Sequence, residues 1–535
     1  MPAVSLRPPS WAGRLVGGGR LWALAALTIA TVWLGFLGAR FGGGVAGTDQ
    51  YWYAGDLRMS AATGRAVSNH VYPLYAASVR AGTLPPRMHD APVTHVASWA
   101  HGVLGAAPGA DGWAWTIVNM TLAVATTAAV VATSRALGGA GGWGAVAFVV
   151  YPTTVWAAVS PLAESSLAFG VAVLVGATVA AERTGRGAWW VVAGAAGGLL
   201  VWGRTNFVLL LGAWVGWLAW STWRARTDER AGRTAGWRVA GVATAAGVVV
   251  GHAVLTASYP NAGLAATLMV GAAGRSSNMD FYFVPVTFDL GRFLDKAAAG
   301  AWRALTPRTP GELTSVLPVV LACALGAAAR ARMPRDRAWT AAMFLAMASL
   351  LTYLVTCAVF QPQTRYLYAT APLAAVLLDV AATRAWSSGR RRLVVRSAVA
   401  LVAVVVVAAG SVRSFNAAMT VHTAGRRAAV STARMEAALA PVVGEQGSVL
   451  VLAPGNATDL AVAYAAIPHP TISVDPALIP PAQARELATA WHVTAVVARP
   501  RDADYVAQMT GSATGRTPRP VASGFAIWPL PAAGR

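Results

Sequence analysis

Long apolar runs, separated by short segments that contain arginine, occupy most of this chain. Most of the runs are about 16–23 residues long, which is enough to cross a bilayer with modest tilt. They lie at 21–38, 113–132, 143–159, 166–181, 188–203, 206–221, 239–257, 313–329, 338–359, 366–383 and 397–412. Only 12% of the residues are charged, about half the usual fraction of a soluble domain. The pattern predicts an all-α polytopic membrane protein with about 11 transmembrane helices.

The arginines predict how these helices are oriented. Residues 1–20 contain Arg7, Arg14 and Arg20, so this segment is expected in the cytoplasm and the first run is expected to be a signal anchor. Every second loop is then short and basic, as the positive-inside rule requires. These loops contain Arg135; Arg183 and Arg186; Arg224, Arg226, Arg230, Arg233 and Arg238; Arg330, Arg332, Arg335 and Arg337; and Arg384, Arg390, Arg391, Arg392 and Arg396. The predicted topology is N-in and C-out.

The region 188–221 decides this topology. It is apolar enough to form one long helix, but Arg204 and Asn206 interrupt it. A single span would place the five-arginine loop that follows on the outside, against the charge rule. We therefore expect two short spans joined by a tight outer turn.

The predicted outer segments are long. Residues 40–111 and 258–312 are expected to form two outer loops. After the last run, 413–445 is expected to be a linker helix and 446–535 a small extracytoplasmic α/β domain. Its expected strands are 448–452, 471–474, 494–498 and 525–528, with helices at 457–466, 481–490 and 503–510. Alternating strands and helices are typical of a layered α/β sheet.

Composition argues against several classes of site. The formal net charge is +21, but the basic residues lie in short loops between apolar runs, which argues against nucleic-acid binding. The two cysteines, Cys323 and Cys357, lie inside apolar runs, so the sequence offers no disulfide framework and no zinc spacing. No P-loop or dinucleotide fingerprint occurs.

Ionisable residues gather at the ends of the runs that are predicted to face outward. Asp49 follows the first run, Glu164 lies between the third and fourth, Arg204 between the fifth and sixth, and Arg365 between the ninth and tenth. A single arginine in such a place is more often an interfacial anchor. Charges of both signs on one membrane face instead favour a functional site.

Short motifs around these residues, taken in order, resemble the GT-C superfamily of polytopic glycosyltransferases. The resemblance is to bacterial relatives of the protein O-mannosyltransferases and the aminoarabinose transferases, and Tyr72-Pro73-Leu74-Tyr75 is also similar to PIG-V-type mannosyltransferases. Gln50 stands where the protein O-mannosyltransferases have glutamate. The motifs are Thr48-Asp49-Gln50-Tyr51; His89-Asp90-Ala91-Pro92 with Leu104-Gly105; Tyr151-Pro152 before Glu164; Arg204-Thr205-Asn206; and Arg365-Tyr366-Leu367 before Pro372.

The resemblance implies a GT-C-like transmembrane domain over 21–412 and a membrane glycosyltransferase. Such an enzyme would move a hexosyl or pentosyl group from a polyprenyl-phosphate donor to an extracytoplasmic glycan, lipid or protein acceptor. Asp49 would be the base, and Arg365, followed by Arg204, would hold the donor phosphate. Glu164, Asp90 and Asp56 would be supporting acids, and Tyr366, His89 and Tyr51 would contact substrate. A divalent cation, Mg²⁺ or Mn²⁺, could use Asp49 and Asp90; the resemblance leaves this open.

Two other functions remain open from the sequence. A transporter or flippase needs ionisable groups near the middle of its spans, and the candidates are His252 and Asp379. A membrane scaffold that binds a partner through its C-terminal domain needs neither the acids nor the arginines of the outer face. The gathered charges favour the transferase.

Overall fold

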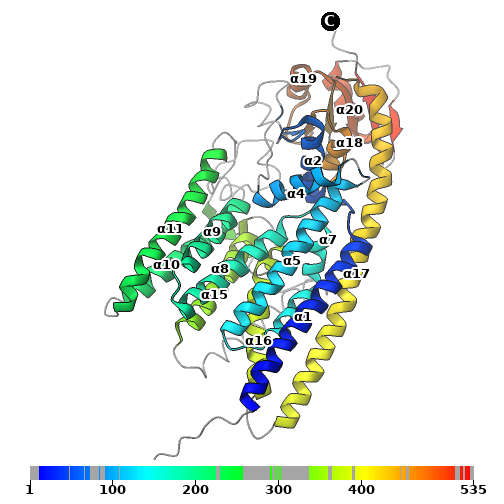
Figure 1. Ribbon diagram of the computed structural model, residues 1–535. Coiled ribbons are helices and arrows are strands. Elements are labelled where there is room, and N and C mark those ends of the chain that lie inside the picture. Colours follow the sequence, from blue (N-terminus) through cyan, green and yellow to red (C-terminus); the bar gives the residue numbers. More distant parts are fainter. Residues whose placement is uncertain are drawn as a thin grey trace, which may run out of the picture.

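The computed structural model shows a bundle of long helices with a small α/β domain at one end (Figure 1). Helix α17 (Arg392–Val443) runs along both parts (Figure 1). The structure describes residues 11–46, 48–65, 67–72, 84, 91–105, 107, 109–224, 229–256, 290–291, 294–295, 298–299, 302, 336–359, 364–387, 392–445, 447–452, 457–511, 518–521 and 524–530.

Helices occupy ten of the eleven predicted apolar runs, and the remaining run, 313–329, lies outside the described residues. Most of the predicted outer segment 258–312 also lies outside them. Six spans, in α1, α5, α8, α11, α15 and the η3–α16 segment, are each long and apolar enough to cross a membrane. The bundle consists of α1 (Trp11–Phe41), α5 (Ala110–Ala136), α6 (Gly142–Val149), α7 (Pro152–Val159), α8 (Glu164–Thr184), α9 (Ala188–Gly203), η1 (Thr205–Phe207), α10 (Val208–Arg224), α11 (Glu229–Thr256), α15 (Arg337–Val359), η3 (Thr364–Thr370), α16 (Ala371–Ser387) and α17 (Arg392–Val443).

The predicted span at 143–159 consists of two helices that meet at a bend. Helices α6 and α7 meet at an angle of 62°. Tyr151 is extended, with φ −67° and ψ 121°, and Pro152 is the first residue of α7. A proline disfavours helical geometry in the residue before it, so α6 has to end where α7 begins.

The predicted last span and the predicted linker helix are continuous with each other. Residues 397–412 and 413–443 belong to one helix, α17, which is 52 residues long. At 1.5 Å per residue it extends about 78 Å. The first part of α17 packs beside α7 and α16, and its last part reaches the strands of the α/β domain.

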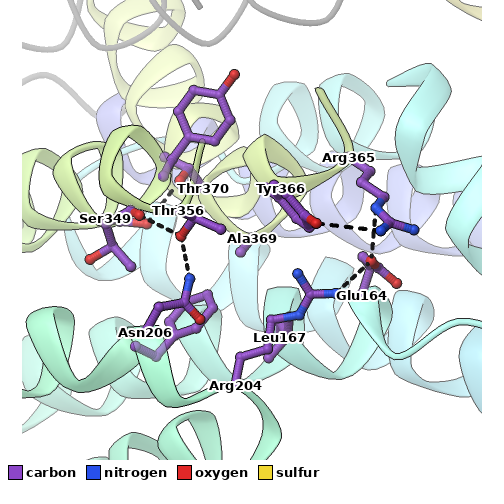
Figure 2. A pocket seen from close by; sticks show the side chains of 13 residues that line it. Glu164, Leu167, Arg204, Asn206, Ser349, Thr356, Arg365, Tyr366, Ala369 and Thr370 are labelled. Atoms are coloured by element: carbon purple, nitrogen blue, oxygen red, sulfur yellow. Dashed lines mark hydrogen bonds and ion pairs between the residues drawn. The ribbon is translucent and has the colours of Figure 1, made fainter. Parts of the chain in front are cut away.

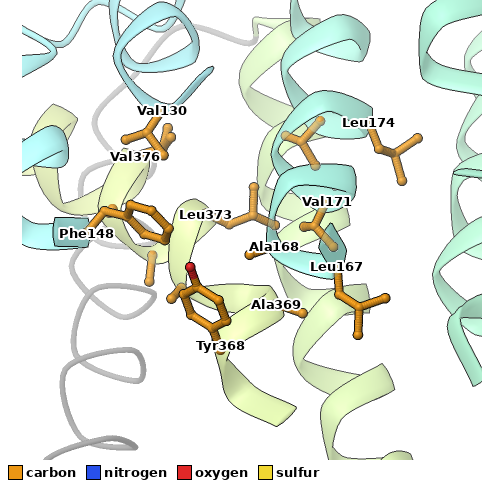
Figure 3. Close-up of a cluster of buried hydrophobic side chains, with 14 of the residues drawn as sticks. Val130, Phe148, Leu167, Ala168, Val171, Leu174, Tyr368, Ala369, Leu373 and Val376 are labelled. Atoms are coloured by element: carbon orange, nitrogen blue, oxygen red, sulfur yellow. The ribbon is translucent and has the colours of Figure 1, made fainter. Parts of the chain in front are cut away.

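Close helix contacts hold the bundle together. A Cβ atom on Gly194 of α9 would lie 2.0 Å from the backbone oxygen of Gly241 in α11, so only glycine permits this approach. In the centre of the bundle, the rings of Phe148 and Tyr368 stack with their centroids 5.8 Å apart. Leucine and valine side chains of α5, α8 and α16 surround these rings (Figure 3).

The predicted strands and helices of the C-terminal region are confirmed. The helices are α18 (Ala457–Ala466), α19 (Pro481–Ala490) and α20 (Ala503–Thr510), and the strands are β2 (Ser448–Leu452), β3 (Thr471–Val474), β4 (Val493–Ala498), β5 (Arg519–Val521) and β6 (Phe525–Pro529). Only β5 lacks a predicted counterpart. The sheet order is β1-β3-β2-β4-β6-β5. Strands β3, β2 and β4 are parallel, and β6 and β5 are antiparallel to their neighbours.

The edge strand β1 (His70–Val71) comes from the first outer segment, far from the other strands in the sequence. It pairs with Thr471 and Ile472 of β3. The side chain of Asn69 donates hydrogen bonds to the carbonyl oxygens of Ala463, at 2.7 Å, and His469, at 3.1 Å. The α/β sheet therefore extends beyond the predicted range 446–535.

Among its described residues, the first outer segment also contains two helices, which were not predicted. Helix α2 (Thr48–Thr63) packs against α18, and α4 (Pro92–Leu104) packs against α2 and α5. In α4, Ala97 and Ala100 are buried, whereas Val96, Trp99 and Val103 are exposed on one side. An exposed apolar stripe beside a buried face is typical of a helix that lies in the membrane interface.

Candidate active site

Four separate chain segments bring their charged residues together at one end of the bundle. Figure 2 shows three of these residues, Glu164, Arg204 and Arg365. Arg365 lies in η3, and its Nη1 atom is 2.5 Å from Oδ2 of Asp49 in α2. The Nε atom of Arg365 is 3.6 Å from Oε1 of Glu164, the first residue of α8. Arg204 follows α9, and its Nη2 atom donates to the same Glu164 oxygen at 3.1 Å. The four residues predicted from the ends of the runs therefore form one network.

The helix ends explain why these charges are stable where they lie. Asp49 is in the first turn of α2 and Glu164 in the first turn of α8, where the helix dipole favours negative charge. Arg204 lies at the C-terminus of α9, where the helix dipole favours positive charge. Arg365 lies just before α16, where the dipole opposes a cation. Its charge therefore depends on Asp49 and Glu164 for compensation.

Two tyrosines complete the network. The guanidinium carbon of Arg204 is 4.7 Å from the ring centroid of Tyr366, and that of Arg365 is 5.2 Å away, so both cations contact one aromatic ring. Tyr53, one turn after Asp49 in α2, is buried beside these charges. Burial raises the pKa of Tyr53, which keeps its hydroxyl protonated. The sequence interpretation gave no role to Tyr53.

A stripe of hydroxyl groups on α15 forms another side of the pocket and was also missed. Ser349, Thr352 and Thr356 are buried and line it. Their spacing places them on one face of the helix. The side chain of Asn206 donates a hydrogen bond to Thr356. Polar residues at helical spacing within an apolar run are the signal that could have identified this wall.

The pocket between these groups is nearly closed. Its volume is about 10 Å³, roughly the space of one water molecule. Glu164 is 2% exposed, whereas the side chain of Asp49 is 32% exposed. Asp49 is therefore the carboxylate of this network that a substrate can reach from outside.

The remaining predicted site residues lie elsewhere. Asp56 is buried further along α2 and does not line this pocket. Tyr51 is on the opposite side of α2 from Asp49, with its ring centroid 5.5 Å from that of Tyr464. His89 and Asp90 lie outside the described residues. A contact between Tyr51 and the donor phosphate at Arg365 therefore finds no support in this arrangement.

The described carboxylates do not fit a divalent cation well. Asp49 and Glu164 both face Arg365, so a metal ion between them would have to displace the guanidinium. Within the described part of the chain, no group of three or more His, Cys, Asp or Glu side chains is placed to hold a metal. The described positive charge beside these carboxylates belongs to Arg204 and Arg365, and Asp90, the other predicted metal ligand, lies outside the described residues.

Comparison with solved structures reveals the fold. ArnT from Cupriavidus metallidurans bound to undecaprenyl phosphate aligns with a TM-score of 0.58 and 16% identity, over 96% of this chain and 98% of that chain. The apo state of the same protein aligns with a TM-score of 0.53 and 17% identity, over 97% of this chain and 98% of that chain. The apo oligosaccharyltransferase of Archaeoglobus fulgidus aligns with a TM-score of 0.52 and 13% identity, over 91% of this chain and 71% of that chain.

Comparisons by sequence give no match. No family model and no curated protein matches this chain. The similarity is therefore one of structure, and it extends over nearly the whole length of both chains. ArnT and the oligosaccharyltransferase are both GT-C glycosyltransferases. The chain has the GT-C fold.

Proposed function

We propose that the protein is a membrane glycosyltransferase that moves a sugar from a polyprenyl-phosphate donor to an acceptor on the extracytoplasmic side. The observation that carries this proposal is the position of Arg365, which bridges Asp49 and Glu164 beside Arg204. Two guanidinium groups and a reachable carboxylate are the groups that such a transfer needs. The fold supports it, because ArnT binds undecaprenyl phosphate.

The charge distribution supports an extracytoplasmic site. Helices α5, α8, α10 and α16 all begin near α2 or the Glu164 network, and each has an arginine in its last turn, at the far end of the bundle. These residues are Arg135, Arg183, Arg224 and Arg384. The positive-inside rule assigns that end to the cytoplasm. The end with Asp49 and Arg365 then faces outward, together with the α/β domain.

The proposed reaction gives separate roles to the two arginines and to Asp49. The donor phosphate displaces Asp49 from Arg365 and binds the guanidinium groups of Arg365 and Arg204. Asp49 is then free to accept the proton of the acceptor hydroxyl, whose oxygen attacks the anomeric carbon. The bond between that carbon and the phosphate oxygen breaks, and the polyprenyl phosphate leaves with the electron pair. The arginines stabilise the charge that develops on the leaving oxygen.

The two residues that a transporter would use, Asp379 and His252, both make structural contacts. Asp379 is fully buried and accepts hydrogen bonds from the backbone nitrogens of Gly141, at 2.8 Å, and Gly144, at 3.0 Å. It therefore caps the first turn of α6. His252 stacks on Trp202, with the ring centroids 5.6 Å apart. These contacts give both residues a role in packing.

A deletion strain tests the proposal. We expect a polyprenyl-phosphate sugar to accumulate in its lipid extract, as measured by mass spectrometry, and expression of the wild-type protein to remove it. Arg365→Ala should fail to remove it although the protein inserts in the membrane. Arg183→Ala, which changes an arginine at the opposite end of the bundle, serves as the matched control and should complement. A deletion strain without the accumulated lipid, or complementation by Arg365→Ala, contradicts the proposal.

A further inference from the structure

Helix α2 separates the Glu164 network from a second polar site. Asp49 and Tyr53 lie on one face of the helix, because four residues make about one turn. Tyr51 and Arg58 lie about half a turn away, on the opposite face. They line a cavity of about 750 Å³ between α2, α17, α18 and the N-terminus of α5. This volume is within the range of ligand pockets, about 300–1,000 Å³.

The cavity contains an organised polar network. Arg58 forms an ion pair with Glu436 of α17, and its guanidinium carbon is 5.2 Å from the ring centroid of Tyr464. The hydroxyl of Tyr464 donates a hydrogen bond to Asp111. Burial and the neighbouring Asp111 carboxylate raise the pKa of Tyr464, so the hydroxyl remains a donor. The residues of this network come from α2, α5, α17 and α18.

Several glycines line the cavity. Gly43 and Gly44 follow α1, Gly102 is in α4, and Gly105 and Gly109 lie between α4 and α5. A glycine leaves its peptide groups open to a ligand, since no side chain covers them. These glycines therefore leave part of the cavity wall without side chains, while the backbone nitrogens of Gly43 and Gly105 already donate to Thr116 and His101.

The cavity lies beyond the apolar part of the bundle. Phe41, the last residue of α1, contacts Phe415 of α17, with ring centroids 5.1 Å apart. Along α17, Gly425 lines the cavity ten residues after Phe415, which is about 15 Å further along the helix. Glu436 lies further still. A ligand of this cavity therefore has its polar part here, above the ends of the spans.

The charges identify the ligand's chemistry. Arg58 is the described arginine that lines the cavity, and it is paired with Glu436, while Asp111 adds a second carboxylate. A phosphate would meet two acids and a cation that already has a partner. A neutral, hydroxyl-rich ligand would donate hydrogen bonds to the carboxylates and place a ring on Tyr51 or Tyr464. These groups therefore suit sugar residues better than an anion.

We propose that this cavity binds a neutral oligosaccharide. This oligosaccharide belongs to the acceptor chain and is attached to the sugar that receives the new residue. The proposal rests on the proposed function, and it narrows the acceptor to a glycan chain. The segment Gly43–Val45 lines the cavity and leads directly into the first turn of α2, where Asp49 lies. A chain held in the cavity could thus reach Asp49 around the N-terminus of α2.

A variant that fills the cavity tests the proposal. Ala429 lines it from α17, so Ala429→Trp introduces a large ring without removing any member of the polar network. Ala424→Trp is the matched control, because it makes the same change in the same helix at an exposed position that lies about 140° around the helix from Ala429 and does not line the cavity. Asp111→Asn gives a second variant that changes hydrogen bonding and not volume. The probes are neutral hexasaccharides of mannose, arabinose and glucose, tested with the full chain in lipid nanodiscs.

Two measurements separate this proposal from the proposed function. Calorimetric titration of the hexasaccharides needs no turnover, and we expect Ala429→Trp and Asp111→Asn to weaken binding at least tenfold while Ala424→Trp does not. Transfer to a monosaccharide glycoside should be unchanged in the control variant Ala424→Trp. The proposal is overturned if wild-type protein binds none of the hexasaccharides, or if both cavity variants bind them as wild type does. Loss of transferase activity in every assay would overturn the proposed function and leave the binding result standing.

Discussion

The guanidinium of Arg365 lies 2.5 Å from the carboxylate of Asp49, although one residue comes from near the start of the chain and the other from its last third. The same guanidinium contacts Glu164. In this arrangement the proposed base and the proposed phosphate ligand neutralise each other. Binding of an anionic donor is therefore expected to separate them, and the predictions that follow depend on this pair.

Replacement of the proposed base should stop transfer and leave the fold intact. Asp49→Asn keeps the size of the side chain but removes its ability to accept a proton. We expect the rate of sugar transfer to fall by about 10²–10⁴-fold. The rate is measured with purified protein in nanodiscs and a polyprenyl-phosphate sugar. A variant that keeps more than half of the wild-type rate would show that Asp49 is not the base.

The arginine that is proposed to hold the phosphate should not tolerate lysine. Arg365→Lys retains the charge but loses the planar fork that binds two phosphate oxygens. A charge-assisted hydrogen bond contributes about 1.5–3 kcal/mol, so we expect kcat/KM for the donor to fall about ten- to a hundredfold. Arg183→Lys, at the far end of the bundle, is the control. Equal kcat/KM in wild type and Arg365→Lys would exclude a forked contact.

Glu164 should be essential for stability. It is 2% exposed and faces both Arg204 and Arg365. Glu164→Gln leaves two guanidinium groups close together without their shared carboxylate, and loss of one member of a buried pair costs on the order of 3–5 kcal/mol. We expect a lower melting temperature in detergent, measured by tryptophan fluorescence. Glu486→Gln, an exposed acid in α19, should not change it. An unchanged melting temperature in Glu164→Gln would mean that the arginines are compensated by other groups.

Docking of β1 onto the sheet should weaken in acid. His70 is buried against Ser473, with its Nε2 atom 2.5 Å from the serine oxygen, and burial lowers the pKa of His70 from 6.5 to about 3. Between these values the unfolded segment binds a proton that the folded segment does not. Stability is therefore complete above about pH 6.5 and falls toward pH 3, by up to about 1.4 kcal/mol per pH unit.

Hydrogen exchange of residues 67–72 at several pH values measures this effect. His70→Gln cannot be protonated and should remove the part of the pH dependence that comes from this residue. Equal pH dependence in the wild type and the variant would show that another group controls docking of β1.

Asp379 should support the fold and not the reaction. Asp379→Asn exchanges a charged acceptor for a neutral one at the start of α6, where the carboxylate accepts two backbone hydrogen bonds. We expect a loss of about 1–3 kcal/mol in stability, seen as a lower melting temperature. Transfer by the folded fraction should be unchanged. A stable protein without activity would instead indicate that Asp379 takes part in function.

The sequence determined the class of protein and the composition of the site. The apolar runs predicted the helices, since the length and hydropathy of a run are local properties. The charges at the ends of the runs predicted that Asp49, Glu164, Arg204 and Arg365 lie at one end of the bundle, because successive spans alternate in direction.

Only the tertiary structure decided which of these groups touch. Arg365 contacts Asp49 and Glu164 through the packing of η3 against α8, and no local pattern contains that information. The pairing of His70–Val71 with β3 is equally non-local. The cavity near Arg58 and Glu436 exists because α2 and α17 lie side by side with α18, so its polar residues come from parts of the chain that the sequence keeps far apart.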